Sequence, residues 1–170
     1  IPNMTIMAPK NKWELSDMLK FAIAAEEPVA IRYPRGEACD LWKDQRAPIQ
    51  KGWAEVLAEG TEVALFAIGS MVETAWQVRK KLAEKGIPTT VVNARFAMPL
   101  DKNCLRKLAE SHPLLVTMEE NVASGGFGEH VAAFLEEEAL HTKVLRIVIP
   151  DCFVEHGSVG ELKKALGLDA

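Results

Sequence analysis

The chain has 170 residues, of which 48% are hydrophobic and 26% charged, as in ordinary globular proteins with one domain or slightly more. Its formal net charge of −4 and its lack of a long basic run argue against nucleic-acid binding. No apolar stretch approaches the roughly 20 residues that span a membrane, so we expect no membrane association.

The three cysteines, Cys39, Cys104 and Cys152, are far apart and form no Cys-x-x-Cys pair. This pattern favours free thiols in a reducing, cytoplasmic location, and it argues against a metal site in this chain. The chain begins with Ile1 instead of methionine, which is typical of a fragment, a proteolytic product or a processed subunit.

The first 38 residues predict one helix and one strand. Asn11 and Glu14 have the spacing of a capping box, and apolar residues then recur at helical spacing to about residue 25. The short apolar run Val29–Ile31 predicts a buried strand that ends near Tyr33. One helix and one strand cannot form a core, so we expect the rest of this unit in the remainder of the polypeptide or in a companion chain.

Two arginines, Arg32 and Arg35, follow this predicted strand around Pro34 and Gly36. Ligands of open α/β sheets bind at the carboxyl ends of the strands, and the arginine fork suits a phosphate or a carboxylate. An ion pair with a neighbouring acidic residue explains the same residues. On chemistry alone, both interpretations stay open.

Residues 39–53 lack periodicity and predict a linker that contacts the surface through Leu41, Trp42 and Ile49. From residue 54 onward, apolar runs of strand length alternate with helical patterns of about 10–15 residues. Strands are expected at Ala54–Leu57, Val63–Ile68, Thr89–Asn93, Leu114–Met118 and Val144–Ile149. This order predicts an α/β fold with a mostly parallel sheet and helices on both faces.

The glycine-rich loop Ser124–Gly128 lies between a predicted strand and a predicted helix but lacks the GxGxxG spacing and the Walker lysine. We therefore expect a tight turn that lets strand and helix pack closely. Glu119 and Glu120 point to opposite faces of a strand. We expect one to cap backbone N–H groups of this loop and the other to face a partner subunit.

No complete catalytic set is visible. His156 precedes a predicted helix, and a hydrogen-bonded structural role is favoured over proton transfer. Two further capping boxes are predicted, at Ser70 with Glu73 and at Ser158 with Glu161. We expect no catalytic, cofactor-binding or metal-binding residues in this chain.

Several segments together resemble the carboxyl-terminal part of the 1-deoxy-D-xylulose-5-phosphate synthase family, within the transketolase superfamily. The resemblance covers essentially the whole chain. The segments that carry it are Ile1–Met4, Ala8–Lys10, Ile31–Gly36, Asn93–Phe96, Pro99–Asp101, Glu119–Asn121, Gly125–Gly128, Pro150–Ser158 and Leu166–Ala170. Met98 stands where this family is expected to have lysine.

The resemblance implies three parts: residues 1–38 as the tail of a pyrimidine-binding domain, 39–53 as a linker, and 54–170 as a transketolase-like carboxyl-terminal domain. It implies a homodimeric transferase of isoprenoid and thiamine biosynthesis that condenses pyruvate with glyceraldehyde 3-phosphate and releases CO₂. Thiamine diphosphate and Mg²⁺ would both be bound outside this chain. Arg35 would bind the substrate phosphate, with Arg32 as a weaker candidate.

Two alternatives remain. The chain is also consistent with the carboxyl-terminal half of another thiamine-diphosphate enzyme, such as transketolase or a 2-oxoacid dehydrogenase β subunit. The other alternative is a purely structural assembly module without activity of its own.

Overall fold

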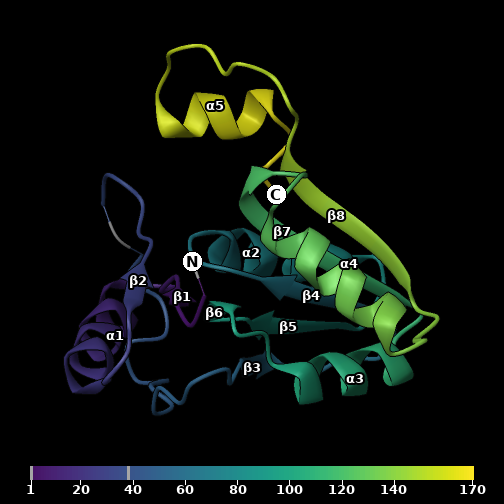
Figure 1. The fold of residues 1–170 in the computed structure, drawn as a ribbon. Coiled ribbons are helices and arrows are strands. Elements are labelled where there is room, and N and C mark those ends of the chain that lie inside the picture. Colours follow the sequence, from purple (N-terminus) through teal and green to yellow (C-terminus); the bar gives the residue numbers. More distant parts are fainter. Residues whose placement is uncertain (1, 38) are drawn as a thin grey trace.

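The computed structural model describes residues 2–37 and 39–170. It contains one small and one large β-sheet (Figure 1). Position 1, where the resembling segments begin, and position 38, the expected domain boundary, fall outside the described residues. No helix in the described part of the chain is both long and apolar enough to cross a membrane.

The small sheet has the strand order β2-β1-β6, in which β1 runs parallel to β2 and antiparallel to β6. Its core contains Met7, Met18 and Phe96, which are all buried. The sequence predicted only the helix and one strand of this unit, because β1 and β6 are too short to show a period. The elements of the small sheet are β1 (Thr5–Met7), α1 (Lys12–Ala24), β2 (Val29–Ile31) and β6 (Phe96–Met98).

The large sheet has the order β3-β5-β4-β7-β8, and only the edge strand β3 is antiparallel to its neighbour. The expected mostly parallel α/β architecture is thus confirmed. Its strands are β3 (Glu55–Ala58), β4 (Val63–Ala67), β5 (Thr89–Asn93), β7 (Leu114–Val122) and β8 (Lys143–Ile149). The helices are α2 (Met71–Glu84), α3 (Lys102–Ser111), α4 (Phe127–Glu137) and α5 (Val159–Ala165).

Helices cover both faces of the large sheet. Alternate residues of β4 point to opposite faces, so Phe66 packs with α3 and α4 while Leu65 packs with α2. Phe66 stacks on Phe127 of α4 with ring centroids 5.3 Å apart. Helix α5 has no buried residue, and Figure 1 shows it standing off from the sheet on an arched loop.

The predicted linker has no helix or strand among its described residues and runs along the surface. Trp42 packs edge-on against Trp76 of α2, with ring centroids 5.5 Å apart, and Ile49 packs on the core of the small sheet. These two contacts were predicted. Leu41 is exposed, contrary to expectation, but its carbonyl accepts a hydrogen bond from Asn11 Nδ2 at 2.7 Å.

At two of the three predicted capping boxes, the side chain of the capping residue accepts a hydrogen bond from a backbone N–H group of the helix. Ser158 forms a full capping box with Glu161, and Asn11 accepts a hydrogen bond from the Glu14 backbone N–H. The capping box predicted at Ser70 is wrong. Ser70 already has helical backbone angles after the turn at Gly69, where φ is +63°, and its side chain caps no N–H group.

Candidate functional site

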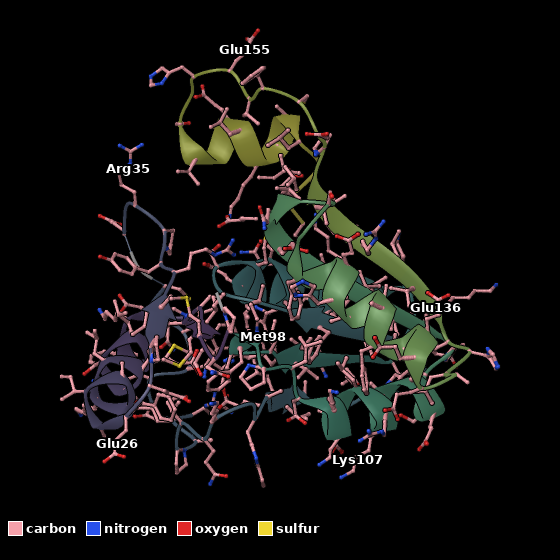
Figure 2. The ribbon with its side chains drawn as sticks, viewed as in Figure 1. Glu26, Arg35, Met98, Lys107, Glu136 and Glu155 are labelled. Carbon is pink, nitrogen blue, oxygen red and sulfur yellow. The ribbon has the colours of Figure 1, made fainter. Side chains whose placement is uncertain are left out.

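Arg32 and Arg35 both lie in the turn after β2, because that strand ends at Ile31, two residues earlier than predicted. Figure 2 shows Arg35 projecting away from the body of the protein. Over residues 2–37 and 39–170, no hydrogen bond or ion pair is formed by its guanidinium. Arg32 instead donates from Nη1 to the backbone oxygen of Glu120 at 3.3 Å. The two arginines therefore have different surroundings.

Arg35 lines a cleft of about 570 Å³ between the turn, the start of α1, the start of α2 and one side of α5. Arg32 does not line this cleft but borders two smaller cavities of about 170 and 160 Å³. The structure thus does not bring the two predicted residues into one site. The charged residues of the cleft are Lys10, Lys12, Arg35, Lys163, Glu37, Glu73 and Glu120.

Glu120 connects the arginine turn to α5. Its carboxylate lies 2.7 Å from Lys163 Nζ, while its backbone oxygen accepts the bond from Arg32. Burial raises the pKa of Glu120, but the hydrogen bond and the charge of Lys163, together with the charge of Arg32, lower it by a larger amount. The pKa of Glu120 therefore lies below its ordinary value. Within this chain Glu120 pairs with Lys163, and the expectation that it faces a partner subunit stays a prediction.

Glu119 holds the glycine-rich loop, as expected for one of the two glutamates. Its side chain is 1% exposed and accepts hydrogen bonds from the backbone N–H groups of Phe127 at 2.8 Å and Gly128 at 2.6 Å. A Cβ atom at Gly126 would lie only 2.9 Å from both Glu119 carboxylate oxygens. The loop is therefore a tight strand-to-helix turn in which the amide groups of Gly125, Phe127 and Gly128 already donate to glutamate side chains.

A buried cluster of four charged residues lies beside the cleft, and the sequence did not reveal it. Lys10 contacts Glu14 and Glu55, and Arg95 lies 2.8 Å from Glu14 and 3.2 Å from Glu55. Asn93 also donates to Glu14, at 2.9 and 3.0 Å. The only signal was Glu14, whose spacing from Asn11 indicated a helix start and nothing more.

The described residues do not provide a site for Mg²⁺ or another metal ion. No three His, Cys, Asp or Glu side chains within ranges 2–37 and 39–170 lie close enough to hold one. His156 is exposed in the loop before α5, with no hydrogen bond to another described residue. Within the described part of the chain, the cleft offers the guanidinium of Arg35 without an acidic partner and shows no assembled catalytic set.

Relatives match the whole chain but are much longer than it. A 1-deoxy-D-xylulose-5-phosphate synthase of Lachnoclostridium phytofermentans is 50% identical over all of this chain and 27% of its own length. 1-Deoxy-D-xylulose-5-phosphate synthase 1 of Geobacter sulfurreducens is 45% identical over the same shares. The chain thus spans about a quarter of the length of these curated relatives.

Two solved structures share the fold. A split-gene transketolase, described as an inactive β4 tetramer, has a TM-score of 0.93 and 30% identity, and the match covers 99% of this chain and 55% of that one. Transketolase from Campylobacter jejuni has a TM-score of 0.70 at 18% identity, over 99% of this chain and 25% of its own. The family described as transketolase, C-terminal domain, matches residues 52–170, well over half of the sequence. The chain belongs to the transketolase C-terminal domain family.

Proposed function

We propose that the chain is the carboxyl-terminal part of a thiamine-diphosphate-dependent 1-deoxy-D-xylulose-5-phosphate synthase and has no activity alone. The parent enzyme condenses pyruvate with glyceraldehyde 3-phosphate and releases CO₂. The observation that carries this proposal is the 50% identity over the whole chain to a protein of that name. The share of that relative that the chain spans, 27%, supports the view that most of the machinery lies elsewhere.

The proposed division has residues 1–38 as the end of a pyrimidine-binding domain, 39–53 as a linker and 54–170 as the carboxyl-terminal domain. The family match beginning at residue 52 supports the second boundary. The described residues of the first part, 2–37, contribute only two strands of three residues and one helix, which supports the view that they are the end of a larger domain. Strand β6 joins the two parts by pairing with β1.

Within this enzyme, Arg35 binds the phosphate of the aldehyde substrate. Its exposed guanidinium lines the cleft and has no acidic partner in the described part of the chain. This disfavours the ion-pair alternative, which requires such a partner. Arg32 supports the turn through its bond to the Glu120 backbone oxygen.

Thiamine diphosphate and Mg²⁺ are held by regions outside this chain. The lack of a group of three His, Cys, Asp or Glu side chains within residues 2–37 and 39–170 supports this location for Mg²⁺. We therefore assign no bond-forming step to these residues. Their role is to bind the phosphate and keep the turn in place.

The missing regions belong to the remainder of the polypeptide or to a companion chain, in a cytoplasmic homodimer. The name of the split-gene transketolase supports a companion chain as a workable arrangement. The three free thiols support a reducing compartment. Calorimetry of the chain alone with thiamine diphosphate and Mg²⁺ should show no binding, whereas stoichiometric binding would contradict the proposed location of the cofactor site.

The function is tested in the assembled enzyme, with CO₂ release from pyruvate as the readout. Replacing Arg35 by Ala should raise the KM for glyceraldehyde 3-phosphate about tenfold or more and leave the KM for pyruvate nearly unchanged. Arg46→Ala is the control, because Arg46 forms an exposed ion pair with Asp17 away from the cleft. Equal effects of Arg35→Ala on both substrates would rule out the phosphate role. Turnover of ketose phosphates instead of pyruvate would identify a transketolase.

A further inference from the structure

Helix α5 forms the wall of the cleft that faces the arginine turn. Val159 and Lys163 both line the cleft, and residues four apart lie on one face of a helix. Arg35 and Gly36 line it from the turn. The cleft is thus built from two segments more than 100 residues apart in the sequence.

Lys163 is the cleft lysine best placed to share a ligand with Arg35. Lys10 is buried between Glu14 and Glu55, and Lys12 is bound to Asp40 and lies 5.0 Å from the Trp13 ring centroid. Lys163 is partly exposed, and among residues 2–37 and 39–170 its one acceptor is a Glu120 oxygen at 2.7 Å. An ammonium group has three donors, so two remain for a ligand.

An ion pair with Glu120 holds Lys163 at the cleft. Helix α5 contributes no buried residue, and its first turn is held by the capping box of Ser158. The ion pair with Glu120 is partly buried, with side chains 22% and 26% exposed. Leu166 and Leu168, just after α5, pack against the core of the large sheet, and the pair with Glu120 holds the lysine itself at the cleft.

We propose that Lys163 binds the same phosphate group as Arg35, from the opposite wall, with Glu120 as its positioning residue. This inference rests on the proposed function of the cleft, and it identifies Lys163 as the second positively charged side chain that binds the phosphate. Arg32 is not that cation, since it borders other cavities and donates to the Glu120 backbone. A phosphate monoester carries up to two negative charges near neutral pH, which suits two cationic side chains.

The acidic residues of the cleft indicate the rest of the ligand. Glu37 and Glu73 line the same space. Carboxylates accept hydrogen bonds from hydroxyl groups and repel additional negative charge. The cleft therefore suits a small hydroxylated compound with a single phosphate, and it disfavours a polyphosphate.

The test uses the whole chain and the unreactive phosphate monoester glycerol 3-phosphate, with binding measured by calorimetry. Lys163→Met should weaken binding about tenfold, as expected for one charge-assisted contact. Lys163→Arg should restore it to within about threefold, since arginine also donates to phosphate. The matched control is Lys164→Met, which removes the same charge from an exposed neighbour on α5 and should change binding less than twofold.

Equal effects of Lys163→Met and Lys164→Met, or no saturable binding to the wild-type chain, would overturn the assignment of Lys163.

Inorganic phosphate and glycerol, each titrated alone, should bind more weakly than glycerol 3-phosphate. Equal binding of inorganic phosphate would refute the hydroxyl contacts. A single cooperative thermal unfolding transition, with a midpoint lowered no more than by Glu120→Gln, shows that the Lys163→Met variant is folded. Normal product formation by the assembled enzyme, with no specific effect of Lys163→Met on binding, would defeat this inference and leave the proposed function standing.

Discussion

Arg95 Nε lies 2.8 Å from Glu14 Oε1, although the two residues are 81 positions apart in the sequence. Their side chains are almost fully buried, and Lys10 and Glu55 complete a cluster with two positive and two negative charges. Buried ions need partners of opposite charge. This cluster therefore ties helix α1 of the small sheet to strand β3 of the large sheet and to Arg95, in the segment between β5 and β6.

Arg95→Met should destabilise the fold by about 3–5 kcal/mol, because it leaves the buried carboxylate of Glu14 without a main partner. Urea unfolding of the purified chain measures this loss. Arg106→Met is the control: it removes an exposed pair with Glu138 and should have a much smaller effect. The double change Glu14→Gln with Arg95→Met should cost less than the sum of the two single changes. Additive losses would contradict a coupled pair.

Glu119→Ala should destabilise the start of α4 by about 1–3 kcal/mol, since the buried N–H groups of Phe127 and Gly128 lose their acceptor. Hydrogen exchange at these two amides should increase more than exchange in the middle of α4. Glu129→Ala is a useful comparison, because Glu129 bonds to Gly125 at the exposed side of the same loop. Unchanged exchange at Phe127 and Gly128 would show that Glu119 does not hold the loop.

Local patterns predicted the large sheet because its central strands bury both faces and therefore consist of apolar runs. Val63–Ala67 and Thr89–Asn93 are such runs, and each was expected within one residue of its observed bounds. The three-residue strands β1 and β6 have no such pattern, since their pairing depends on residues about 90 positions away. Strand β7 also extends four residues further than predicted, to Val122.

The candidate site was only partly predictable for the same reason. Arg35 stands out in the sequence as an arginine after an apolar run, and the structure places it on a cleft. Its separation from Arg32 depends on the contact of Arg32 with Glu120, 88 positions later. Lys163 has no local signal, because it is one of two adjacent lysines on a short helix and only the fold distinguishes them.

Acid should weaken the attachment of α5. The folded-state pKa of Glu120 lies below its ordinary value of 4.5, despite the opposing effect of burial, because Lys163 and Arg32 favour the charged carboxylate. The pair with Lys163 therefore stabilises the fold above about pH 4.5, and this contribution is lost as the pH falls through the lowered pKa. The difference in unfolding free energy between wild type and Glu120→Gln should be about 1 kcal/mol at pH 7.

That difference should shrink as the pH falls from 7 to 3, because the wild-type carboxyl loses its charge as the pH approaches its lowered pKa. Urea unfolding at both pH values measures it. Other carboxylates with lowered pKa, such as Glu138 and Glu161, titrate in both proteins and cancel in the comparison. If this difference in unfolding free energy grows on acidification, the pKa of Glu120 is raised and not lowered in the folded state.

Two glycines should respond to alanine in opposite directions. At Gly126 a Cβ atom would lie 2.5 Å from the backbone oxygen of Val122, so Gly126→Ala should cost about 1–3 kcal/mol through overpacking. At Gly160, inside α5, a Cβ atom would have no neighbour within 4 Å. Gly160→Ala should therefore stabilise α5 by about 0.5–1 kcal/mol. Thermal unfolding of both variants tests the pair, and destabilisation by Gly160→Ala would contradict the exposed position of α5.

The cysteines should differ strongly in their reactivity. Burial, followed by the nearby charge of Asp101, raises the pKa of Cys104 to about 12, so almost no reactive thiolate exists at neutral pH. Cys152 is exposed in the loop before α5. Brief treatment with iodoacetamide at pH 7.5, followed by mass spectrometry, should modify Cys152 and leave Cys104 intact. Urea should make Cys104 react at the rate of an ordinary thiol, and fast labelling of Cys104 in the folded chain would show that α3 does not shield it.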